Sequence, residues 1–360
     1  MKILFVTSGA YIPEFTGGIE STIHDMSVLL QQRGLSPGVM ARLRKRTLRA
    51  RLHGARRLLG LGQAVLRDTG LGYPVYRMSR PTDRVGEVVD AFRPDVAIVQ
   101  RGRIRQFAEA FRRAGVPVLV YLHHANFHHM SDSYPSEGVG YVANARFTAD
   151  EFARETGLPA DVLFPVVDRT PYLTETRGDA VLFINPVAVK GLEVALYLAQ
   201  ARPDIPFIFV ESWPLDRAAW TMLQKRTEAC ANIQLIRRTQ DMRSLYARAR
   251  VLMAPSQWDE PWGRVVTEAQ MNGIPALATN RGGLPESVGT GGLLVDADAE
   301  PSAWLEALGQ MWDDADTYAA LSTEASHRSS AGDVAQDHLM DEFLRIVDRQ
   351  IAATNQGQKG

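Results

Sequence analysis

One stretch of the chain reads Val251-Leu-Met-Ala-Pro-Ser256-Gln-Trp-Asp-Glu260-Pro-Trp-Gly263-Arg264-Val-Val-Thr-Glu268-Ala-Gln-Met-Asn-Gly273. Its first residues form a short apolar run typical of a buried strand, which we expect to end at Ala254. A polar loop follows, and a helix is predicted to begin near Pro261, because proline is suited to the first helical turn. The stretch is therefore a strand–loop–helix unit.

Similar apolar runs recur along the whole chain, separated by helical patterns. In the first half they are Ile3–Val6, Val75–Met78, Val96–Val99, Val118–Leu122, Tyr141–Ala143 and Val162–Val166. In the second half they are Val181–Ile184, Phe207–Val210, Ile233–Ile236, Val251–Met253, Ala276–Ala278 and Leu293–Val295. Runs without apolar/polar alternation are typical of strands buried on both faces, and strands that alternate with helices imply parallel sheets.

The number of runs predicts two doubly wound α/β domains, since one such sheet uses roughly five to seven strands. A length of 360 residues also suits two domains. We predict one Rossmann-like domain over residues 1–170 and a second over 171–333, joined near Asp168–Gly178. A last helix over 334–354 carries Leu339, Phe343 and Ile346 on one face. No strand follows that helix, so we expect it to dock on a domain already formed.

Composition excludes several classes of protein. The chain is 45% apolar and 22% charged, and 40 basic against 41 acidic residues leave no polycationic signature for nucleic acid. The single cysteine excludes a disulfide framework and a multi-cysteine metal cluster. No apolar run reaches the length of a membrane span, and the apolar run at the start of the chain is too short for a signal peptide. We expect a cytoplasmic protein.

The loop after the strand at 251–254 carries residues suited to a nucleotide sugar. Ligands of open parallel sheets bind beyond the carboxyl ends of strands, so we expect the site in the cleft between the domains. Free N–H groups at a helix start near Pro261 favour an anion, and Arg264 adds a fork for phosphate. The carboxylates of Glu260 and Glu268 can accept hydrogen bonds from sugar and ribose hydroxyls.

A plainer interpretation of the same residues is open at this point. Asp259 and Glu260 can simply favour the dipole of the following helix. Arg264 and Glu268, one helical turn apart, can form a surface ion pair worth a few tenths of a kcal/mol.

The pattern Glu260-x7-Glu268 has further ordered companions. These are Pro255-Ser256, Gly273-Ile274-Pro275, Gly282-Gly283-Leu284-Pro285-Glu286, Gly17-Gly18, Asn144-Ala145-Arg146-Phe147-Thr148 and Lys190-Gly191. Together they resemble the signature of retaining family-4 glycosyltransferases of the GT-B fold. The resemblance implies an acceptor-binding first domain, a nucleotide-sugar-binding second domain, and a last helix that returns to the first domain.

The resemblance also implies roles for the donor residues. Glu268 would bind the ribose, and Glu260 would hold a sugar hydroxyl beside the backbone of Pro261, Trp262 and Gly263. Lys190 would contact the diphosphate, although alone it also fits a solvated lysine that opens a helix at Gly191.

One departure from the family pattern concerns the diphosphate. The family usually has a Gly-Arg pair upstream of the lysine, whereas this chain has Ile184-Asn185-Pro186. We therefore expect Arg264 to supply the second positive charge. Gly17 and Gly18 would let the backbone approach a phosphate or acceptor, although a glycine pair is more often only a flexible turn.

Histidines crowd the end of the strand at 118–122, namely His123, His124, His128 and His129. No acidic or cysteine partner shares their spacing, so we predict no metal site. The resemblance places His123 near the reacting sugar, and His124 falls where the family commonly has aspartate. His124 and Arg146 are the candidate acceptor contacts. Arg146 also fits a surface arginine at the start of a helix over 148–155.

The segment Arg42–Arg67 holds nine arginines and lysines and no acidic residue. Leucines share one face of a helical pattern, which suits an anionic membrane surface or a phosphorylated lipid carrier. A solvated helix that packs its leucines on the first domain is an equally good interpretation, and Gly54, Gly60 and Gly62 argue against one long rigid helix.

These features predict a glycosyltransferase of the kind used in polysaccharide biosynthesis. It would move a sugar from a nucleoside diphosphate sugar to a glycan, lipid-linked or small-molecule acceptor. The resemblance implies retention of anomeric configuration without a metal or another cofactor. Two alternatives remain, a sugar-nucleotide 2-epimerase or hydrolase on the same fold, and a non-catalytic sugar-binding scaffold.

Overall fold

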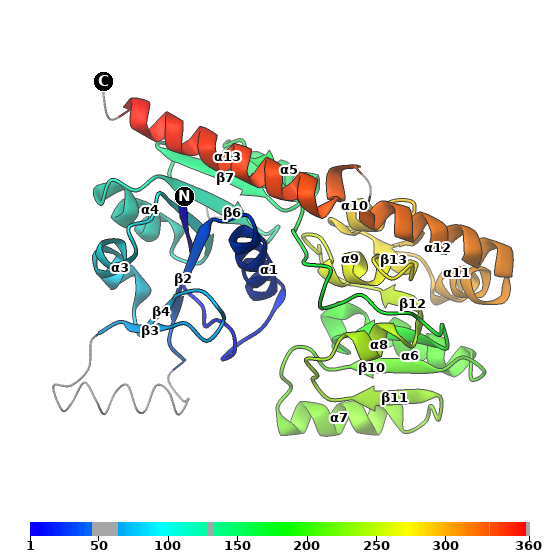
Figure 1. Cartoon of the computed structure of the whole chain (residues 1–360). Helices are drawn as coiled ribbons and strands as arrows, with labels where there is room; N and C mark the ends of the chain where they lie inside the picture. Colours follow the sequence, from blue (N-terminus) through cyan, green and yellow to red (C-terminus); the bar gives the residue numbers. More distant parts are fainter. Residues whose placement is uncertain (45–63, 129–132, 331, 358–360) are drawn as a thin grey trace. The chain divides into compact units, whose positions relative to one another are not determined.

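The computed structural model describes residues 1–44, 64–128, 133–330 and 332–357, and the chain divides into two compact units. Unit 1 comprises Met1–Val166 and Leu339–Gly360, and unit 2 comprises Val167–His338. The boundaries between the units fall after residue 166 and after residue 338, whereas the boundaries predicted from the sequence lie after 170 and after 333. Figure 1 shows the elements of both units along the chain. Within the described ranges, no helix has both the length and the apolar character needed to cross a membrane.

Unit 1 contains an eight-stranded sheet in the order β3-β4-β2-β1-β5-β6-β7-β8. The strands are β1 (Lys2–Thr7), β2 (Ser36–Arg42), β3 (Leu66–Asp68), β4 (Val75–Met78), β5 (Val96–Arg101), β6 (Val118–Leu122), β7 (Val139–Ala143) and β8 (Asp161–Val162). All neighbours pair in parallel except β3 and β4. The carboxyl ends of the parallel strands therefore share one edge of the sheet.

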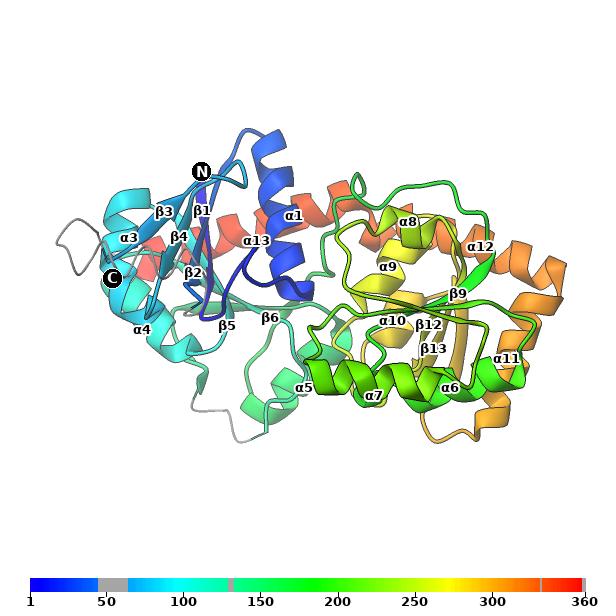
Figure 2. The ribbon, with the colours of Figure 1, turned by 90° about the horizontal axis from the view of Figure 1, so that it is seen from below.

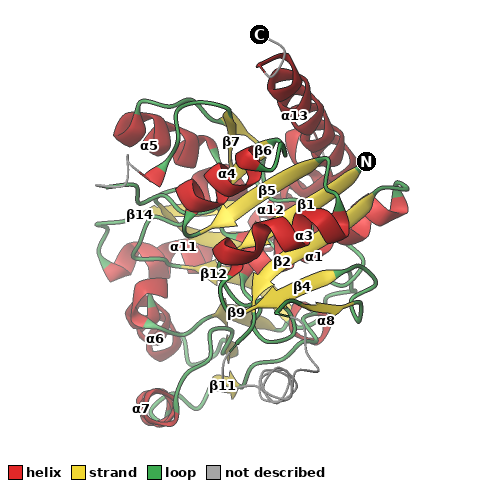
Figure 3. Ribbon diagram, turned by 90° about the vertical axis from the view of Figure 1, so that its left-hand side faces the viewer, coloured by secondary structure: helices red, strands yellow, loops and turns green. Residues whose placement is uncertain are grey.

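Helices cover both faces of this sheet. They are α1 (Gly18–Gln32), α3 (Val85–Phe92), α4 (Ile104–Arg113), α5 (Arg146–Thr156) and most of α13 (Gln336–Gly357), with the short 3-10 helix η1 (Pro81–Arg84). Apolar residues of α3, α4 and α5 share one core with β5 and β6. On the other face the ring of Phe343 in α13 stacks 6.2 Å from Phe5 in β1. Figure 3 shows α3 and α4 in front of the strands and α13 behind them.

Unit 2 contains a six-stranded parallel sheet in the order β11-β10-β9-β12-β13-β14. Its strands are β9 (Ala180–Ile184), β10 (Phe207–Val210), β11 (Ile233–Ile236), β12 (Ala249–Ala254), β13 (Ala276–Asn280) and β14 (Gly292–Asp296). Because β10, β9 and β12 are neighbours, the loops that follow these three strands emerge side by side.

The helices of unit 2 also form two layers. They are α6 (Leu192–Ala201), α7 (Arg217–Thr227), α8 (Arg243–Tyr246), α9 (Arg264–Gln270), α10 (Leu284–Val288), α11 (Pro301–Asp313) and α12 (Ala315–Ser330), with 3-10 helices η3 (Ala188–Lys190) and η4 (Gly332–Val334). Side chains of α6 and α11 fill the core on one face, and those of α8, α9 and α10 fill the other. Figure 2 shows α6 and α11 on one side of β9 and β12, and α8 and α9 on the other.

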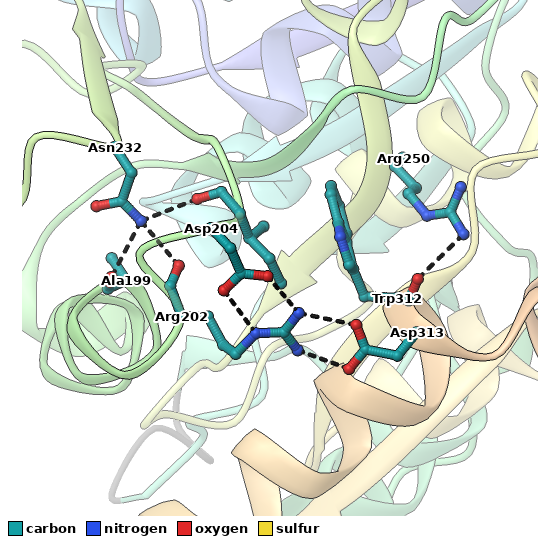
Figure 4. A network of polar contacts seen from close by, with 8 residues as sticks. Ala199, Arg202, Asp204, Asn232, Arg250, Trp312 and Asp313 are labelled. Carbon is teal, nitrogen blue, oxygen red and sulfur yellow. Dashed lines mark hydrogen bonds and ion pairs between the residues drawn. The ribbon is translucent and has the colours of Figure 1, made fainter.

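A polar network fastens the end of α6 to α11 (Figure 4). The guanidinium of Arg202 donates to Asp313 at 2.8 Å through two nitrogens, and to Asp204 at 2.7 and 2.9 Å. The side-chain amide of Asn232 contacts the carbonyls of Ala199 and Arg202 at 3.0 Å. These contacts satisfy carbonyl groups that the end of α6 would otherwise leave without partners.

Several predicted bounds are wrong for identifiable reasons. The run Val162–Val166 is a strand only over Asp161–Val162, because β7 ends at Ala143 and Pro165 has no N–H to donate. The helix predicted near Pro261 begins at Arg264, because Gly263 takes a left-handed conformation with φ of 90°. The two ends of the basic segment are strands rather than a helix, since Arg42 closes β2 and Leu66–Asp68 form β3. Residues 45–63 of that segment lie outside the described residues.

Candidate active site

Three loops of unit 2 meet at the carboxyl ends of β9, β10 and β12. The first carries Lys190, the second Trp213, and the third runs from Pro255 to Gly263. The backbone N–H of Gln257 donates to the carbonyl of Val189 at 2.9 Å, which joins the first loop to the third. The second and third loops both approach Lys190, as described below, so the three loops frame one polar cluster.

Glycines allow these loops to approach closely. A Cβ on Gly191 would lie 2.0 Å from the carbonyl oxygen of Pro255, and its φ is +85°. On the other side of the third loop, the N–H of Gly283 donates to the carbonyl of Glu260 at 2.6 Å. A Cβ on Gly283 would lie 2.2 Å from the carbonyl oxygen of Pro261. The loop is therefore held on both sides by backbone contacts that require glycine.

Lys190 and Glu260, which the sequence places 70 residues apart, form an ion pair in this cluster. The carboxylate of Glu260 also accepts a hydrogen bond of 2.6 Å from the hydroxyl of Ser256. The lysine side chain is 15% exposed and that of Glu260 10% exposed. Lys190 is thus not a solvated lysine, and Glu260 pairs with it rather than merely favouring a helix dipole. The neighbouring Asp259 pairs with Arg281 at 3.0 Å.

Arg264 and Glu268 form the second charged pair of the site. The guanidinium Nε donates to Glu268 Oε1 at 2.7 Å, and the Tyr246 hydroxyl donates to Oε2 at 2.7 Å. The two charged side chains are only 9% and 7% exposed, so the interpretation of this pair as a surface ion pair is wrong. Burial and the charge of Glu268 raise the pKa of Tyr246 well above its ordinary value. The guanidinium also donates to the hydroxyl of Tyr172 at 3.0 Å.

The segment Pro261–Gly263 presents backbone rather than side chains. The indole of Trp262 is buried, and its N–H donates to the hydroxyl of Thr267 at 2.9 Å. A Cβ on Gly263 would lie 2.6 Å from a methyl group of Leu284, which leaves no room for another residue there. The Trp262 side chain therefore stabilises the loop from the inside.

The candidate residues of unit 1 lie at the carboxyl edge of its own sheet. Burial and the neighbouring His124 lower the pKa of His123 to about 3, so its imidazole is neutral near pH 7. The Nε2 atom of His123 is buried and has no hydrogen-bond partner among the described residues. His124 Nε2 lies 3.1 Å from the hydroxyl of Tyr134, and burial lowers the pKa of His124. His128 pairs with Glu155 at 3.3 Å, and His129 lies outside the described residues.

Gly17 and Gly18 open α1 on the same edge. Gly17 is the N-cap of α1, and a Cβ there would lie 3.0 Å from Glu20 Oε2. A Cβ on Gly18 would have no such neighbour within 4 Å. Burial raises the pKa of Glu20, and the charge of Arg101 opposes that rise. Arg146 is exposed at the start of α5, with its guanidinium 5.2 Å from the ring centre of Phe164.

The described residues contain no group of three or more histidine, cysteine or acidic side chains arranged to hold a metal ion. The polar pairs described above are instead suited to hydroxyls and phosphates, since they offer carboxylate acceptors beside cationic donors.

Comparisons with known proteins bear on this arrangement. Residues 185–328 match the family model described as "Glycosyl transferases group 1". This region is similar to the group 1 glycosyltransferases, and we call it the group 1 region. It contains all the candidate donor residues of unit 2, Lys190, Glu260, Arg264 and Glu268 among them.

Curated relatives align over part of their length. A D-inositol 3-phosphate glycosyltransferase of Paenarthrobacter aurescens is 31% identical over 219 residues, which cover 53% of each protein. A protein of the same name from Corynebacterium kroppenstedtii is 38% identical over 93 residues, which cover 25% of this chain and 20% of that protein. The chain thus spans about a fifth to a half of the length of these relatives.

Solved structures share the whole fold with this chain. The Anabaena HepE structure in complex with UDP has a TM-score of 0.73 and 16% identity, covering 97% of this chain and 100% of that one. A glycosyltransferase of Rickettsia africae has a TM-score of 0.76 and 14% identity, covering 97% and 98%. The predicted pair of Rossmann-like domains in the GT-B arrangement of elements is confirmed by these matches.

Several residues around the site in unit 2 were missed in the sequence. Tyr246 and Tyr172 contact the Arg264–Glu268 pair, and Trp213 and Trp258 flank Lys190. Asn185, noted only as a departure from the family pattern, accepts hydrogen bonds from the backbone of residues 212 and 213. Only the place of Trp258, two residues before Glu260, was a usable signal, because the other contacts join residues that lie more than 20 positions apart in the sequence.

Proposed function

We propose that this chain is a retaining glycosyltransferase that uses a nucleoside diphosphate sugar. The observation that carries the proposal is the Lys190–Glu260 pair at the convergence of three loops, inside the group 1 region. An ammonium beside a carboxylate offers one group for a diphosphate and one for a sugar hydroxyl. The buried Glu268 carboxylate is assigned to the ribose.

The chemistry requires stabilisation of a leaving diphosphate. In the proposed step the acceptor oxygen bonds to the anomeric carbon, and the bond from that carbon to the diphosphate oxygen breaks. The acceptor proton passes to the departing phosphate on the same face. Lys190, Arg264 and the backbone of 261–263 stabilise the negative charge that develops on the diphosphate. No carboxylate is assigned as a nucleophile, since Glu260 is engaged by Lys190 and Ser256.

Unit 1 is proposed to bind the acceptor. The neutral imidazole of His123 has a buried ring nitrogen without a partner among the described residues, which suits a hydrogen bond to a sugar hydroxyl. His124, Arg146 and the backbone of Gly17 and Gly18 are assigned to the acceptor side or to phosphate. The proposed reaction uses no metal or other cofactor.

The comparisons suggest which compounds to test first. HepE of Anabaena has been solved with UDP-glucose, at 17% identity to this chain. Curated relatives are named D-inositol 3-phosphate glycosyltransferases. We therefore propose UDP-glucose as the first donor, with inositol phosphates, lipid-linked sugars and glycans as acceptors.

The first experiment measures nucleotide binding by calorimetry with UDP, ADP and GDP. The Lys190→Met variant is expected to bind the preferred diphosphate roughly 10- to 150-fold more weakly, the range for a hydrogen bond to a charged group. Lys225→Met is the matched control, because Lys225 is exposed on α7. Equal affinities of both variants and the wild-type protein would contradict the assignment of Lys190.

The second experiment separates transfer from the alternatives. Release of nucleotide that depends on an acceptor supports transfer, whereas release without any acceptor indicates an epimerase or hydrolase. NMR of the product's anomeric carbon then reports retention or inversion. Activity in EDTA is expected to equal activity without it, and a loss restored by a divalent cation would refute the metal-free mechanism.

A peripheral contact with the inner face of an anionic membrane is proposed for the segment Arg42–Arg67. Nine basic residues without an acidic one support this proposal. Flotation with vesicles that contain phosphatidylserine tests it, and absence of binding at low salt would refute it.

A further inference from the structure

Two indole rings enclose the ammonium group of Lys190. Its Nζ lies 4.9 Å from the ring centre of Trp213 and 5.1 Å from that of Trp258. The two rings lie 6.3 Å apart and at 86° to each other, so they form a corner. The ammonium lies in this corner, with the carboxylate of Glu260 as its ionic partner.

The corner belongs to the fixed framework of the loops. The N–H of Trp213 donates to the side-chain oxygen of Asn185 at 2.5 Å, which holds the loop after β10 against the end of β9. Trp258 follows Gln257, whose N–H donates to Val189, the residue before Lys190. Each ring is thus anchored through its backbone close to the strand end from which the lysine emerges.

Packing alone does not account for these rings. Trp258 is 42% exposed, and it is among the largest apolar side chains on the surface of the described residues. By contrast Trp262 and Trp304 of the same unit are buried. An indole left in water at a polar site gives up part of the stabilisation that burial would supply. What Trp258 gains there is its contact with a cation and with a second indole.

The physical effect of the corner on the lysine is twofold. Each ring face carries negative electrostatic potential and attracts the ammonium. A free lysine side chain also loses rotamer entropy when a ligand fixes it. The rings restrict the side chain before any ligand binds, which reduces that cost at the moment of binding.

We propose that Trp213 and Trp258 are positioning residues that hold the Lys190 ammonium ready for the diphosphate of the donor. This inference rests on the proposed role of Lys190. The ammonium has three N–H groups, of which Glu260 takes one, so a diphosphate can bind the same ammonium without removing it from the corner.

The decisive experiment changes the electrostatics of the rings without changing their shape. Trifluorotryptophan is incorporated at position 213 or at position 258 by nonsense suppression, and binding of the preferred nucleoside diphosphate and of its nucleoside is measured by calorimetry. We expect the Kd of the diphosphate to rise roughly 3- to 30-fold, as the strength of a cation–π contact implies. The Kd of the nucleoside, which has no phosphate, stays unchanged.

Trp312 provides the matched control. Its ring lies 5.3 Å from the guanidinium of Arg250, a contact of the same kind within unit 2 (Figure 4). Trifluorotryptophan at position 312 is expected to leave both Kd values as in the wild-type protein. An unchanged diphosphate Kd with trifluorotryptophan at both 213 and 258 overturns the proposal, and so does a rise of similar size at 312.

A second measurement needs no nucleotide. Acylation of Lys190 by an acetyl ester is followed by mass spectrometry in the ligand-free protein, with the exposed Lys225 as internal reference. Trp258→Leu is expected to accelerate acylation of Lys190 relative to Lys225 at least threefold, and an unchanged ratio refutes the enclosure. Failure of the wild-type protein to bind UDP, ADP and GDP would refute the proposed function, while the acylation ratio would still test the corner.

Discussion

Removal of either charge from the Arg264–Glu268 pair should strongly destabilise unit 2. The substitutions are Glu268→Gln, Arg264→Gln and the two combined. Both charged side chains are less than 10% exposed and joined at 2.7 Å, so each single substitution leaves the other charge buried without its ionic partner. Breaking a buried pair in this way costs about 3–5 kcal/mol.

The double variant should recover part of that loss. With neither charge present, the uncompensated burial disappears, and we expect a coupling energy of about 2–3 kcal/mol between the two positions. The Tyr246 hydroxyl can still donate to the amide oxygen that Glu268→Gln introduces, so the double variant keeps one hydrogen bond at this place.

The assay follows from the position of the tryptophans. All six lie between residues 213 and 312, within unit 2, so tryptophan fluorescence in urea reports the unfolding of that unit. The control pair is Arg226 and Glu193, which are also joined closely, at 2.5 Å, but are 36% and 70% exposed. Neutralising either of these should change the free energy of unfolding by less than about 1 kcal/mol.

The reasoning would be refuted by additive effects of the two substitutions at 264 and 268. A decrease in the free energy of unfolding below about 1 kcal/mol for each single variant would also refute it, because such small effects are characteristic of an exposed ion pair. Nucleotide affinity should be measured on the same variants below their urea transitions. Any loss of binding is then assigned to the site rather than to unfolding.

Three further predictions concern single positions. Gln100→Leu should stabilise unit 1 by about 1 kcal/mol, because both polar atoms of this 2% exposed amide have no partner among the described residues. Calorimetry measures this effect, and a lower melting temperature than that of the wild-type protein would contradict it. Since burial lowers the pKa of His123 to about 3, the unfolded state takes up a proton below pH 6.5 that the folded state does not, so stability falls as pH falls from about 6.5 toward 3. Protonation of this group in the unfolded state should lower the free energy of unfolding by about 2 kcal/mol at pH 5. In thermal melts, the melting temperature of His123→Gln should therefore fall less between pH 6.5 and pH 5 than that of the wild-type protein. Gly191→Ala should destabilise unit 2 by about 2–4 kcal/mol in urea, because its Cβ would meet the Pro255 carbonyl and its φ is positive; a wild-type fluorescence midpoint would show that the loop yields.

Much of the fold could be predicted from local sequence. The strands β6 and β10 have the predicted bounds, because a strand buried on both faces leaves an unbroken apolar run. The bounds of β4 and β11 are also as predicted, although Arg77 and Gln234 interrupt their apolar runs. β2 was missed because Pro37 and Gly38 interrupt its run, and neither residue is typical of a strand. The start of α9 was misplaced because the left-handed Gly263 lies after the proline, and the neighbouring loop at Gly282–Gly283 holds the segment out of the helix.

The sequence by itself determined the two-sheet architecture and the spacing of Glu260 and Glu268, since both depend on residues that are close along the chain. Only the tertiary structure decided what these carboxylates contact. Lys190 reaches Glu260 across 70 residues, and Tyr246 reaches Glu268 across 22. Parallel strands carry their loops to one edge of a sheet in an order that differs from the order of the chain. Local patterns record which residues form a strand, but strand order decides which loops become neighbours.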